Sequence, residues 1–156
     1  MKYNTPFGKN RSSYNPNIKK NLEKFIKKIN KTNVKITKDK FADFDFSNLG
    51  EDDFVYCDPP YLITTGSYND GNRGIKDWTL EDEKKLLDIL DDLNSRGVKF
   101  ALSNVLIAND KKNEILTEWS KKYTVYIIEN SFNNSNYRRK KKDDTIEVLI
   151  TNYREV

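Results

Sequence analysis

Residues 54–61, with the sequence Phe-Val-Tyr-Cys-Asp-Pro-Pro-Tyr, constrain the fold of this chain more than any other stretch. Four strand-forming residues followed by a proline pair predict a short buried strand that stops at the prolines, because proline has no N–H to donate to a neighbouring strand. Asp58 and Tyr61 are therefore expected on a stiff turn at the carboxyl end of the strand. In an open α/β sheet, this is the edge at which ligands bind.

The segments around this turn alternate between strand and helix patterns, which predicts an α/β fold with helices packed on a sheet. Apolar residues at helical spacing indicate the helices, and Thr79 and Gly97 have the residue types that cap helix ends. The expected helices cover residues 17–30, 80–96 and 111–121, and the expected strands cover residues 34–37, 54–57, 98–102, 123–128 and 146–151. Residues 41–46 alternate aromatic and acidic side chains and fit either a half-buried strand or an irregular loop.

The last two expected strands are joined by a basic, polar segment rather than by a helix. This connection predicts a mixed sheet, in which an antiparallel hairpin closes an otherwise parallel sheet. A length of 156 residues suits one domain with its own core, so we interpret residues 1–156 as a single domain.

The chain has one cysteine, Cys57, and no histidine. This composition excludes an internal disulfide and histidine-activated nucleophiles, and we expect no metal site. No stretch approaches the ~18 apolar residues of a membrane helix, so we expect no membrane partner. Any catalysis would rest on carboxylates, amides, tyrosines, backbone groups or a cofactor.

The residues of the turn have a chemistry that suits an exocyclic aromatic amine. Such an amine is a poor nucleophile because its lone pair is delocalised into the ring. The Asp58 carboxylate and the Pro59 carbonyl form an oxygen pair that can accept both N–H hydrogens and draw the nitrogen toward a tetrahedral shape. Tyr61 offers a flat face on which a base flipped out of a duplex could stack. The alternative is an ordinary strand-ending turn, since Asp-Pro and Pro-Pro are common turn formers.

Three polar segments have two interpretations each. Residues 62–74 are long and glycine-rich, which suits a mobile lid, and Tyr68 within them is either a substrate or cofactor contact or a plain loop aromatic. Residues 1–16 mix basic and aromatic side chains and either grip a nucleic acid or form a simple arm. The basic run 138–142 either contacts DNA phosphates or is a solvated loop.

The motif at 58–61 resembles the catalytic motif of adenine-N6 DNA methyltransferases, and more specifically that of the Dam-type group, the D12 class. Residues 4–8, Asn-Thr-Pro-Phe-Gly, are similar to the segment that follows the target-recognition hairpin in that group. Residues 100–104 are similar to the next sheet strand, residues 135–142 to the loop that contacts DNA near the flipped base, and residues 147–153 to the closing strand. These matches occur in the correct order over essentially the whole chain.

The resemblance implies a role for particular residues. Asp58, Pro59, Pro60 and Tyr61 would be catalytic, and S-adenosyl-L-methionine would be bound by Asp58 together with Asp43 and Phe44, which would hold its adenine ring. Double-stranded DNA would be the partner. The implied DNA contacts are Asn4, Pro6, Lys9, Arg11, Tyr68, Ser103, Asn104, Asn136, Tyr137, Arg138, Arg139 and Lys140.

One part of the family pattern is missing. The lysine-rich segment and glycine loop that cradle the methionine end of the cofactor have no counterpart among these residues. The chain is therefore expected to be the C-terminal part of an incomplete Rossmann-like methyltransferase fold, with residues 1–16 as a remnant of the target-recognition segment. We expect a complementary N-terminal chain or self-association to cover the cut sheet.

Three functions remain open at this point. The first is a site-specific adenine-N6 DNA methyltransferase, bacterial or phage-encoded and cytoplasmic, that needs a partner chain. The second is a catalytically silent remnant that at most binds DNA. The third is a methyltransferase acting on another planar nitrogen, such as that of an RNA base or a glutamine amide, against which the Dam-like flanking segments argue.

Overall fold

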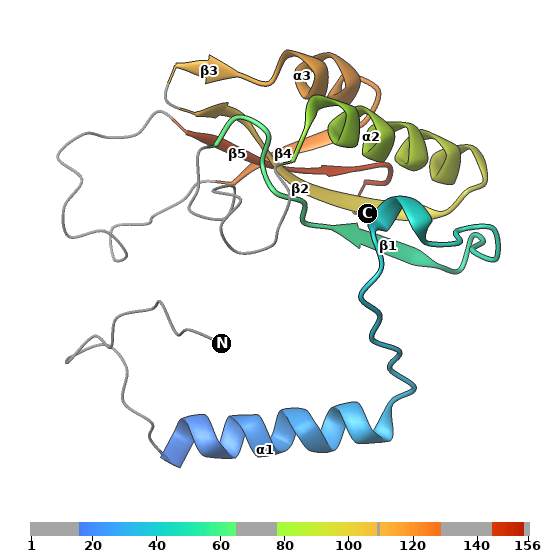
Figure 1. Cartoon of the computed structure of the whole chain (residues 1–156), viewed down its shortest axis with the longest axis vertical. Coiled ribbons are helices and arrows are strands. Elements are labelled where there is room, and N and C mark those ends of the chain that lie inside the picture. Colours follow the sequence, from blue (N-terminus) through green and yellow to red (C-terminus); the bar gives the residue numbers. More distant parts are fainter. Residues whose placement is uncertain (1–15, 65–77, 109, 129–144, 155–156) are drawn as a thin grey trace, which may run out of the picture. The chain divides into compact units, whose positions relative to one another are not determined.

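A computed structural model of the chain describes residues 16–64, 78–108, 110–128 and 145–154 (Figure 1). The chain divides into two compact units, residues 1–39 and residues 40–156. We describe each unit by itself.

The first unit contains helix α1 (Pro16–Lys31), which confirms the helix expected over 17–30. Its apolar residues fall on one stripe, and none of its side chains is buried within the structure. The strand expected over 34–37 is wrong, because these residues form irregular chain and Ile36 is 83% exposed. Strand propensity alone does not make a strand when no neighbouring strand pairs with the segment.

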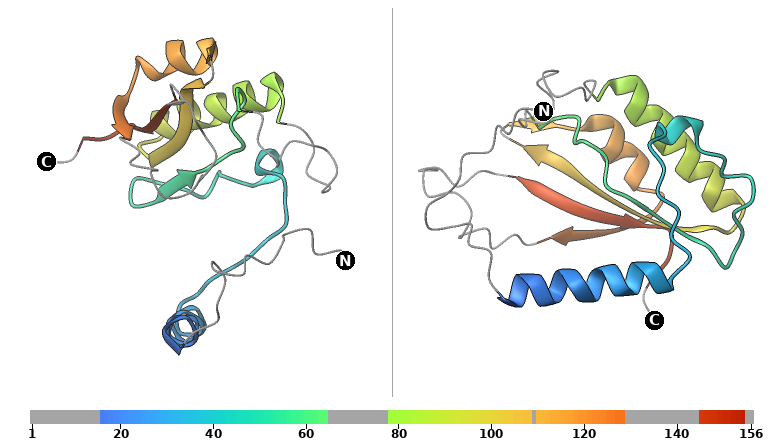
Figure 2. Two further views of the ribbon diagram at one scale, coloured as in Figure 1. Left: turned by 90° about the vertical axis from the view of Figure 1, so that its left-hand side faces the viewer. Right: turned by 60° about the horizontal axis from the view of Figure 1, so that its bottom comes forward.

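The second unit is built on a mixed sheet of strands β1 (Phe54–Cys57), β2 (Lys99–Ala108), β3 (Lys111–Lys112), β4 (Thr124–Ile128) and β5 (Ile146–Thr151). The strand order is β1-β2-β5-β4, and β3 pairs with the end of β2. β1 and β2 are parallel, whereas β5 is antiparallel to both of its neighbours. Figure 2 shows β2, β5 and β4 side by side.

This topology confirms the mixed α/β sheet and the antiparallel pairing of the last two strands. It also adds two features. β5 inserts between β2 and β4 rather than extending the sheet outward. In addition, β2 does not stop at residue 102 as expected but continues to Ala108, because β5 pairs with it from Ala101 to Ile107.

Helices α2 (Leu80–Ser95) and α3 (Glu114–Ser120) lie on the same face of the sheet (Figure 1). Thr79 caps α2 as expected: its hydroxyl accepts from the Asp82 N–H, and the Asp82 carboxylate accepts from the Thr79 N–H. This reciprocal pair is a capping box. Gly97 follows the helix with a φ of 77°, a backbone conformation that favours glycine.

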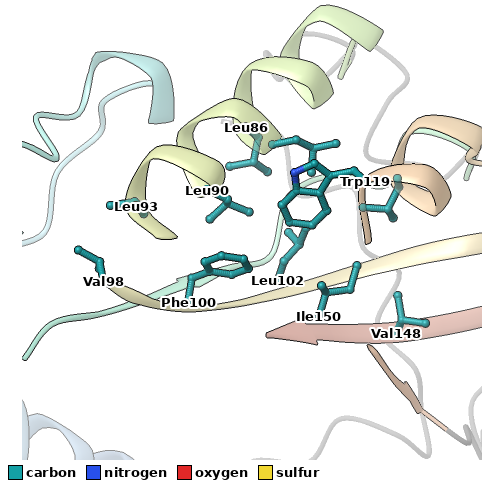
Figure 3. Packing of buried hydrophobic residues seen from close by; sticks show 11 residues of the cluster. Leu86, Leu90, Leu93, Val98, Phe100, Leu102, Trp119, Val148 and Ile150 are labelled. Carbon is teal, nitrogen blue, oxygen red and sulfur yellow. The ribbon is translucent and has the colours of Figure 1, made fainter. Parts of the chain in front are cut away.

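The core lies between these helices and the sheet. Alternate residues of β2 and β5 point toward α2 and α3, so that aliphatic side chains of α2 meet Phe100 of β2 and Trp119 of α3 (Figure 3). The buried cluster comprises Leu86, Leu87, Leu90, Leu93, Val98, Phe100, Leu102, Leu116, Trp119, Val148 and Ile150.

One carboxylate joins the two helices at the edge of this core. Asp91 of α2 accepts hydrogen bonds from Trp119 Nε1 at 2.9 Å, from the Tyr123 hydroxyl at 2.5 Å and from Lys122 Nζ at 2.6 Å. The carboxylate is about one-third exposed. These contacts hold α3 and the connection between α3 and β4 against α2.

The sequence left open whether residues 41–46 form a half-buried strand or an irregular loop. Phe41–Asp43 form a single turn of 3-10 helix, η1, and the following residues are irregular. The loop interpretation is therefore correct, and the half-buried strand is wrong. Arg96 fixes the end of this loop, because its Nη1 donates to the carbonyls of Phe46 at 3.0 Å and Leu49 at 3.1 Å.

Candidate active site at the Asp-Pro-Pro-Tyr turn

The turn at 58–61 follows β1 directly, as expected. Val55 and Cys57 pack against the core, whereas Phe54 and Tyr56 point away from it and are 54% and 59% exposed. The two prolines are half-buried and Asp58 is exposed, so its carboxylate faces solvent at the carboxyl edge of β1. The motif therefore combines a half-buried proline pair, which is rigid, with a carboxylate that is accessible from solvent.

Cys57 adjoins the turn but is not a candidate nucleophile. Burial raises the pKa of its thiol to about 11. The thiol is therefore protonated at neutral pH, and only the thiolate is an effective nucleophile. The chemistry of this edge rests on the carboxylate, the carbonyls and the phenol.

The Tyr61 hydroxyl lies among side chains from three segments. It is 3.4 Å from Asp58 Oδ1, 3.3 Å from Ser103 Oγ on β2 and 3.5 Å from Glu147 Oε1 on β5. The phenol has one proton, so it can donate fully to only one of the carboxylates at a time, while the Ser103 hydroxyl can donate to the phenol oxygen. Two neighbouring strands thus help to set the position of the Tyr61 ring.

The pKa of Tyr61 is raised above its usual value by several causes. Burial is the largest cause, and the negative charges of Asp58 and Glu147 add to it, whereas the Ser103 hydrogen bond acts in the opposite direction. Tyr61 is consequently a neutral phenol at physiological pH. A neutral ring suits stacking and hydrogen bonding rather than proton abstraction.

Ser103 and Asn104 were both expected at the catalytic edge, but they point to opposite faces of β2. Ser103 faces Tyr61, as described above. Asn104 is fully buried on the helix side, where its Nδ2 donates to Glu83 Oε1 at 3.2 Å. Ser103 is 7% exposed and Asn104 0% exposed, and the DNA contacts expected for both residues stay predictions from the sequence.

Asp43 and Phe44 lie at the end of the η1 turn. Both are exposed, Phe44 to 48%, and its ring packs edge-on against Phe46 with the centroids 4.8 Å apart. An exposed aromatic ring can stack on an adenine ring, and an exposed carboxylate beside it can accept hydrogen bonds from a ligand. The cofactor role expected for these two residues stays a prediction from the sequence.

Most of the predicted DNA contacts lie outside the residues that the structure describes. These are Asn4, Pro6, Lys9, Arg11, Tyr68, Asn136, Tyr137, Arg138, Arg139 and Lys140. Their roles remain predictions from the sequence.

Sequence reasoning missed two carboxylates. Glu147 was considered only as part of the closing strand, although a single acid inside the apolar run of residues 146–150 is a signal that it points to a polar site. The sequence places Glu83 in the first turn of a helix beside two other acids, and in the structure it is fully buried. Nothing in its local sequence distinguishes it from Glu81 or Asp82.

No helix in the described ranges is long and apolar enough to cross a bilayer. Within the same ranges, no three side chains of the His, Cys, Asp or Glu type converge where they could hold a metal ion.

The sheet and the turn together define a class of protein. A parallel strand pair is followed by an antiparallel strand inserted between β2 and β4, helices cover one face, and Asp-Pro-Pro-Tyr stands at the carboxyl end of β1. These features are those of a partial methyltransferase fold.

The chain belongs to the D12 class N6 adenine-specific DNA methyltransferase family, whose family model matches residues 1–144. It is similar to the Type II methyltransferase M.FokI of Planomicrobium okeanokoites, with 55% identity over 98% of this chain and 24% of the relative. It is also similar to the modification methylase StsI of Streptococcus sanguinis, with 48% identity over 98% of this chain and 24% of the relative. The modification methylase LlaI of Lactococcus lactis subsp. lactis is 36% identical over 97% of this chain and 23% of the relative. The chain thus spans about a quarter of the length of these relatives.

Proposed function

We propose that this chain forms the target-base half of an enzyme that transfers a methyl group from S-adenosyl-L-methionine to N6 of an adenine in double-stranded DNA. One observation carries the proposal: the Asp58 carboxylate stands at the end of β1 with the Tyr61 hydroxyl 3.4 Å away, next to Ser103 of β2. Family membership supports the choice of adenine over other planar nitrogens.

The residues of the turn have different roles at the target amine. The Asp58 carboxylate and the Pro59 carbonyl accept the two N6–H hydrogens, which localises the nitrogen lone pair for attack. The Tyr61 ring stacks on a base that has been flipped out of the duplex, and such stacking contributes roughly 1–3 kcal/mol per base. Orientation and fixed charge supply most of the rate acceleration, since none of these groups is a strong base.

The cofactor, when bound, supplies an electrophilic methyl group on a positively charged sulfur. On this chain, Phe44 would stack on its adenine ring and the Asp43 carboxylate would accept a hydrogen bond from it. The exposure of both residues supports this assignment. The methionine end would be held by a glycine-loop segment that these 156 residues do not contain.

We further propose that the segment carrying this glycine loop docks beside β1. Among the described residues, β1 pairs with β2 alone, and Phe54 and Tyr56 are more than half exposed. Parallel sheets are normally covered on both faces. A short apolar strand at the edge of a sheet is also a template for pairing with another segment. The bacterial relatives favour the cytoplasm, where chromosomal DNA lies, as the working compartment.

The experiment is a methylation assay with tritiated S-adenosyl-L-methionine and duplex DNA, using the chain together with a polypeptide that carries the glycine-loop segment of this family. We expect incorporation into adenine N6 by the complemented enzyme and its loss in Asp58→Ala. Asp88→Ala is the matched control, because Asp88 is an exposed acid on α2 away from the turn. DNA binding without incorporation under all conditions would favour the silent remnant instead.

A further inference from the structure

Glu83 is a buried carboxylate that the chemistry at the turn does not use. Among the described residues, it is the one charged side chain that is buried, and its exposure is 0%. It accepts three hydrogen bonds: from Trp78 Nε1 at 2.7 Å, from Asn113 Nδ2 at 2.9 Å and from Asn104 Nδ2 at 3.2 Å. A buried carboxylate held by neutral donors is costly to desolvate, so this arrangement calls for an explanation.

Helix capping is not that explanation. The capping box of α2 is complete without Glu83, because Thr79 and Asp82 satisfy each other. The three donors instead come from three different segments: Trp78 precedes α2, Asn104 lies on β2 and Asn113 caps α3. One carboxylate therefore fixes all three segments relative to α2.

The Trp78 contact leads toward the residues proposed to bind the cofactor. The Trp78 ring packs on Phe41, with the centroids 5.3 Å apart. Phe41 begins the η1 turn, and its carbonyl accepts from the Phe44 N–H at 3.4 Å. Glu83 accepts a hydrogen bond from the indole N–H, and the tilted Phe41 ring packs against the indole, so Trp78 braces the turn that carries Asp43 and Phe44.

We propose that Glu83 is a positioning residue for the cofactor end of the site: by holding Trp78 it sets Phe41, and with it the turn at 41–44 that would receive the adenine ring of the cofactor. The inference rests on the proposed function for the identity of this ligand. The brace itself rests only on the contacts of Glu83, Trp78 and Phe41.

A purely structural role for Glu83 predicts a different result. In that case, neutralising Glu83 would lower the stability of the whole unit and all kinetic parameters would change together. Asp91 provides the matched control, because it is also a carboxylate of α2 that accepts an indole N–H, here from Trp119 at 2.9 Å. Its contacts lead to α3 and to the connection between α3 and β4, and not to the turn at 41–44.

The kinetic experiment uses the complemented enzyme with the variants Glu83→Gln, Trp78→Phe and Asp91→Asn. Glu83→Gln keeps the side-chain volume, and Trp78→Phe keeps an aromatic ring on Phe41 but removes the N–H. We expect each of these two variants to raise the KM for S-adenosyl-L-methionine by about tenfold, the size expected for one lost hydrogen bond to a charged group, with kcat and the KM for DNA unchanged. Asp91→Asn should leave the cofactor KM within twofold of wild type.

The double variant Glu83→Gln/Trp78→Phe separates a shared contact from two independent defects. If both residues act through the same hydrogen bond, its cofactor KM should match that of either single variant. Multiplied effects, or equal changes in kcat and in both KM values, would overturn the positioning role. Should Glu83→Gln fail to fold, the comparison of Trp78→Phe with wild type still decides the question.

A second measurement does not depend on catalysis. NMR of the 156-residue chain alone should show cross-relaxation between the Trp78 and Phe41 rings, and we expect it to be lost in Glu83→Gln, together with shifts of the Phe44 amide signal. Retained cross-relaxation and unchanged signals would contradict the brace. A complemented wild-type enzyme that bound no cofactor would instead reject the proposed function, so the two failures are distinguishable.

Discussion

The Tyr61 hydroxyl lies 3.3 Å from Ser103 Oγ, although the two residues are 42 positions apart in the chain. β1 and β2 are parallel neighbours in register, so the turn after β1 stands beside the middle of β2. The aromatic residue of the motif is therefore anchored to the sheet and not only to its own turn. Under the proposed function, such an anchor would restrict ring rotation before a base binds and so lower the entropic cost of stacking.

Removing the Tyr61 ring should have a much larger effect than removing its hydroxyl. Tyr61→Ala loses base stacking, worth roughly 1–3 kcal/mol, and should lower kcat/KM for DNA by about 10- to 100-fold. Tyr61→Phe keeps the ring and should stay within about fivefold of wild type. Single-turnover methylation by the complemented enzyme measures both, and a Phe variant as defective as the Ala variant would show that the hydroxyl has a direct chemical role.

Neutralising Glu147 should lower the pKa of Tyr61. Burial remains the main cause of the raised pKa, but the negative charge of Glu147 contributes to it and is absent in Glu147→Gln. The Tyr61 phenol should therefore ionise at a lower pH in the variant. Titration followed by NMR of isotopically labelled tyrosine rings measures this, and an unchanged Tyr61 titration would argue against the contact.

The stability contributed by Asp91 should depend on pH. Burial by itself would raise the pKa of this carboxyl, but the hydrogen bonds from Lys122, Tyr123 and Trp119 together lower it below the usual value of 3.8. A lowered pKa means that the contribution is present above the unfolded-state pKa and is lost as the pH falls through the folded-state pKa. Urea unfolding at pH 7 should separate wild type from Asp91→Asn, and the difference should shrink below about pH 4.

Gly97→Ala should destabilise the second unit, by about 1–2 kcal/mol, because an L-residue is strained at the observed φ of 77°. A Cβ there would also lie 2.9 Å from Glu51 Cγ, a flexible side chain that can shift. Gly50→Ala is the control, since a Cβ at Gly50 meets nothing within 4 Å. Equal unfolding midpoints for the two variants in urea would contradict the backbone argument.

The basic run 138–142 should govern the salt dependence of DNA binding, as predicted from the sequence. Each phosphate contact that is lost reduces the slope of log K against log salt by roughly one unit. Replacing the five basic residues by glutamine should flatten this slope, whereas replacing the exposed lysines of α1 tests whether any loss of positive charge has the same effect. Fluorescence anisotropy with labelled duplex DNA measures both slopes.

Local signals in the sequence predicted several elements correctly. The proline pair ended β1, and Thr79 and Gly97 marked the ends of α2, because each of these effects acts within a few residues of the chain. The same local logic failed at residues 34–37, where β-propensity was present but no pairing strand was found within the described residues. A strand is stabilised by its neighbours, and a propensity for extended backbone does not supply them.

The sequence by itself determined which groups stand at the turn: a carboxylate, a proline carbonyl and a tyrosine at the end of a strand, in a motif that resembles the catalytic motif of the D12 class. Only the tertiary structure decided which residues surround that turn. The insertion of β5 between β2 and β4 brought Glu147 to Tyr61, and the alternation of β2 turned Ser103 toward Tyr61 but Asn104 toward Glu83. These relationships depend on long-range strand pairing and register, which join residues far apart in the chain, and no local pattern encodes them.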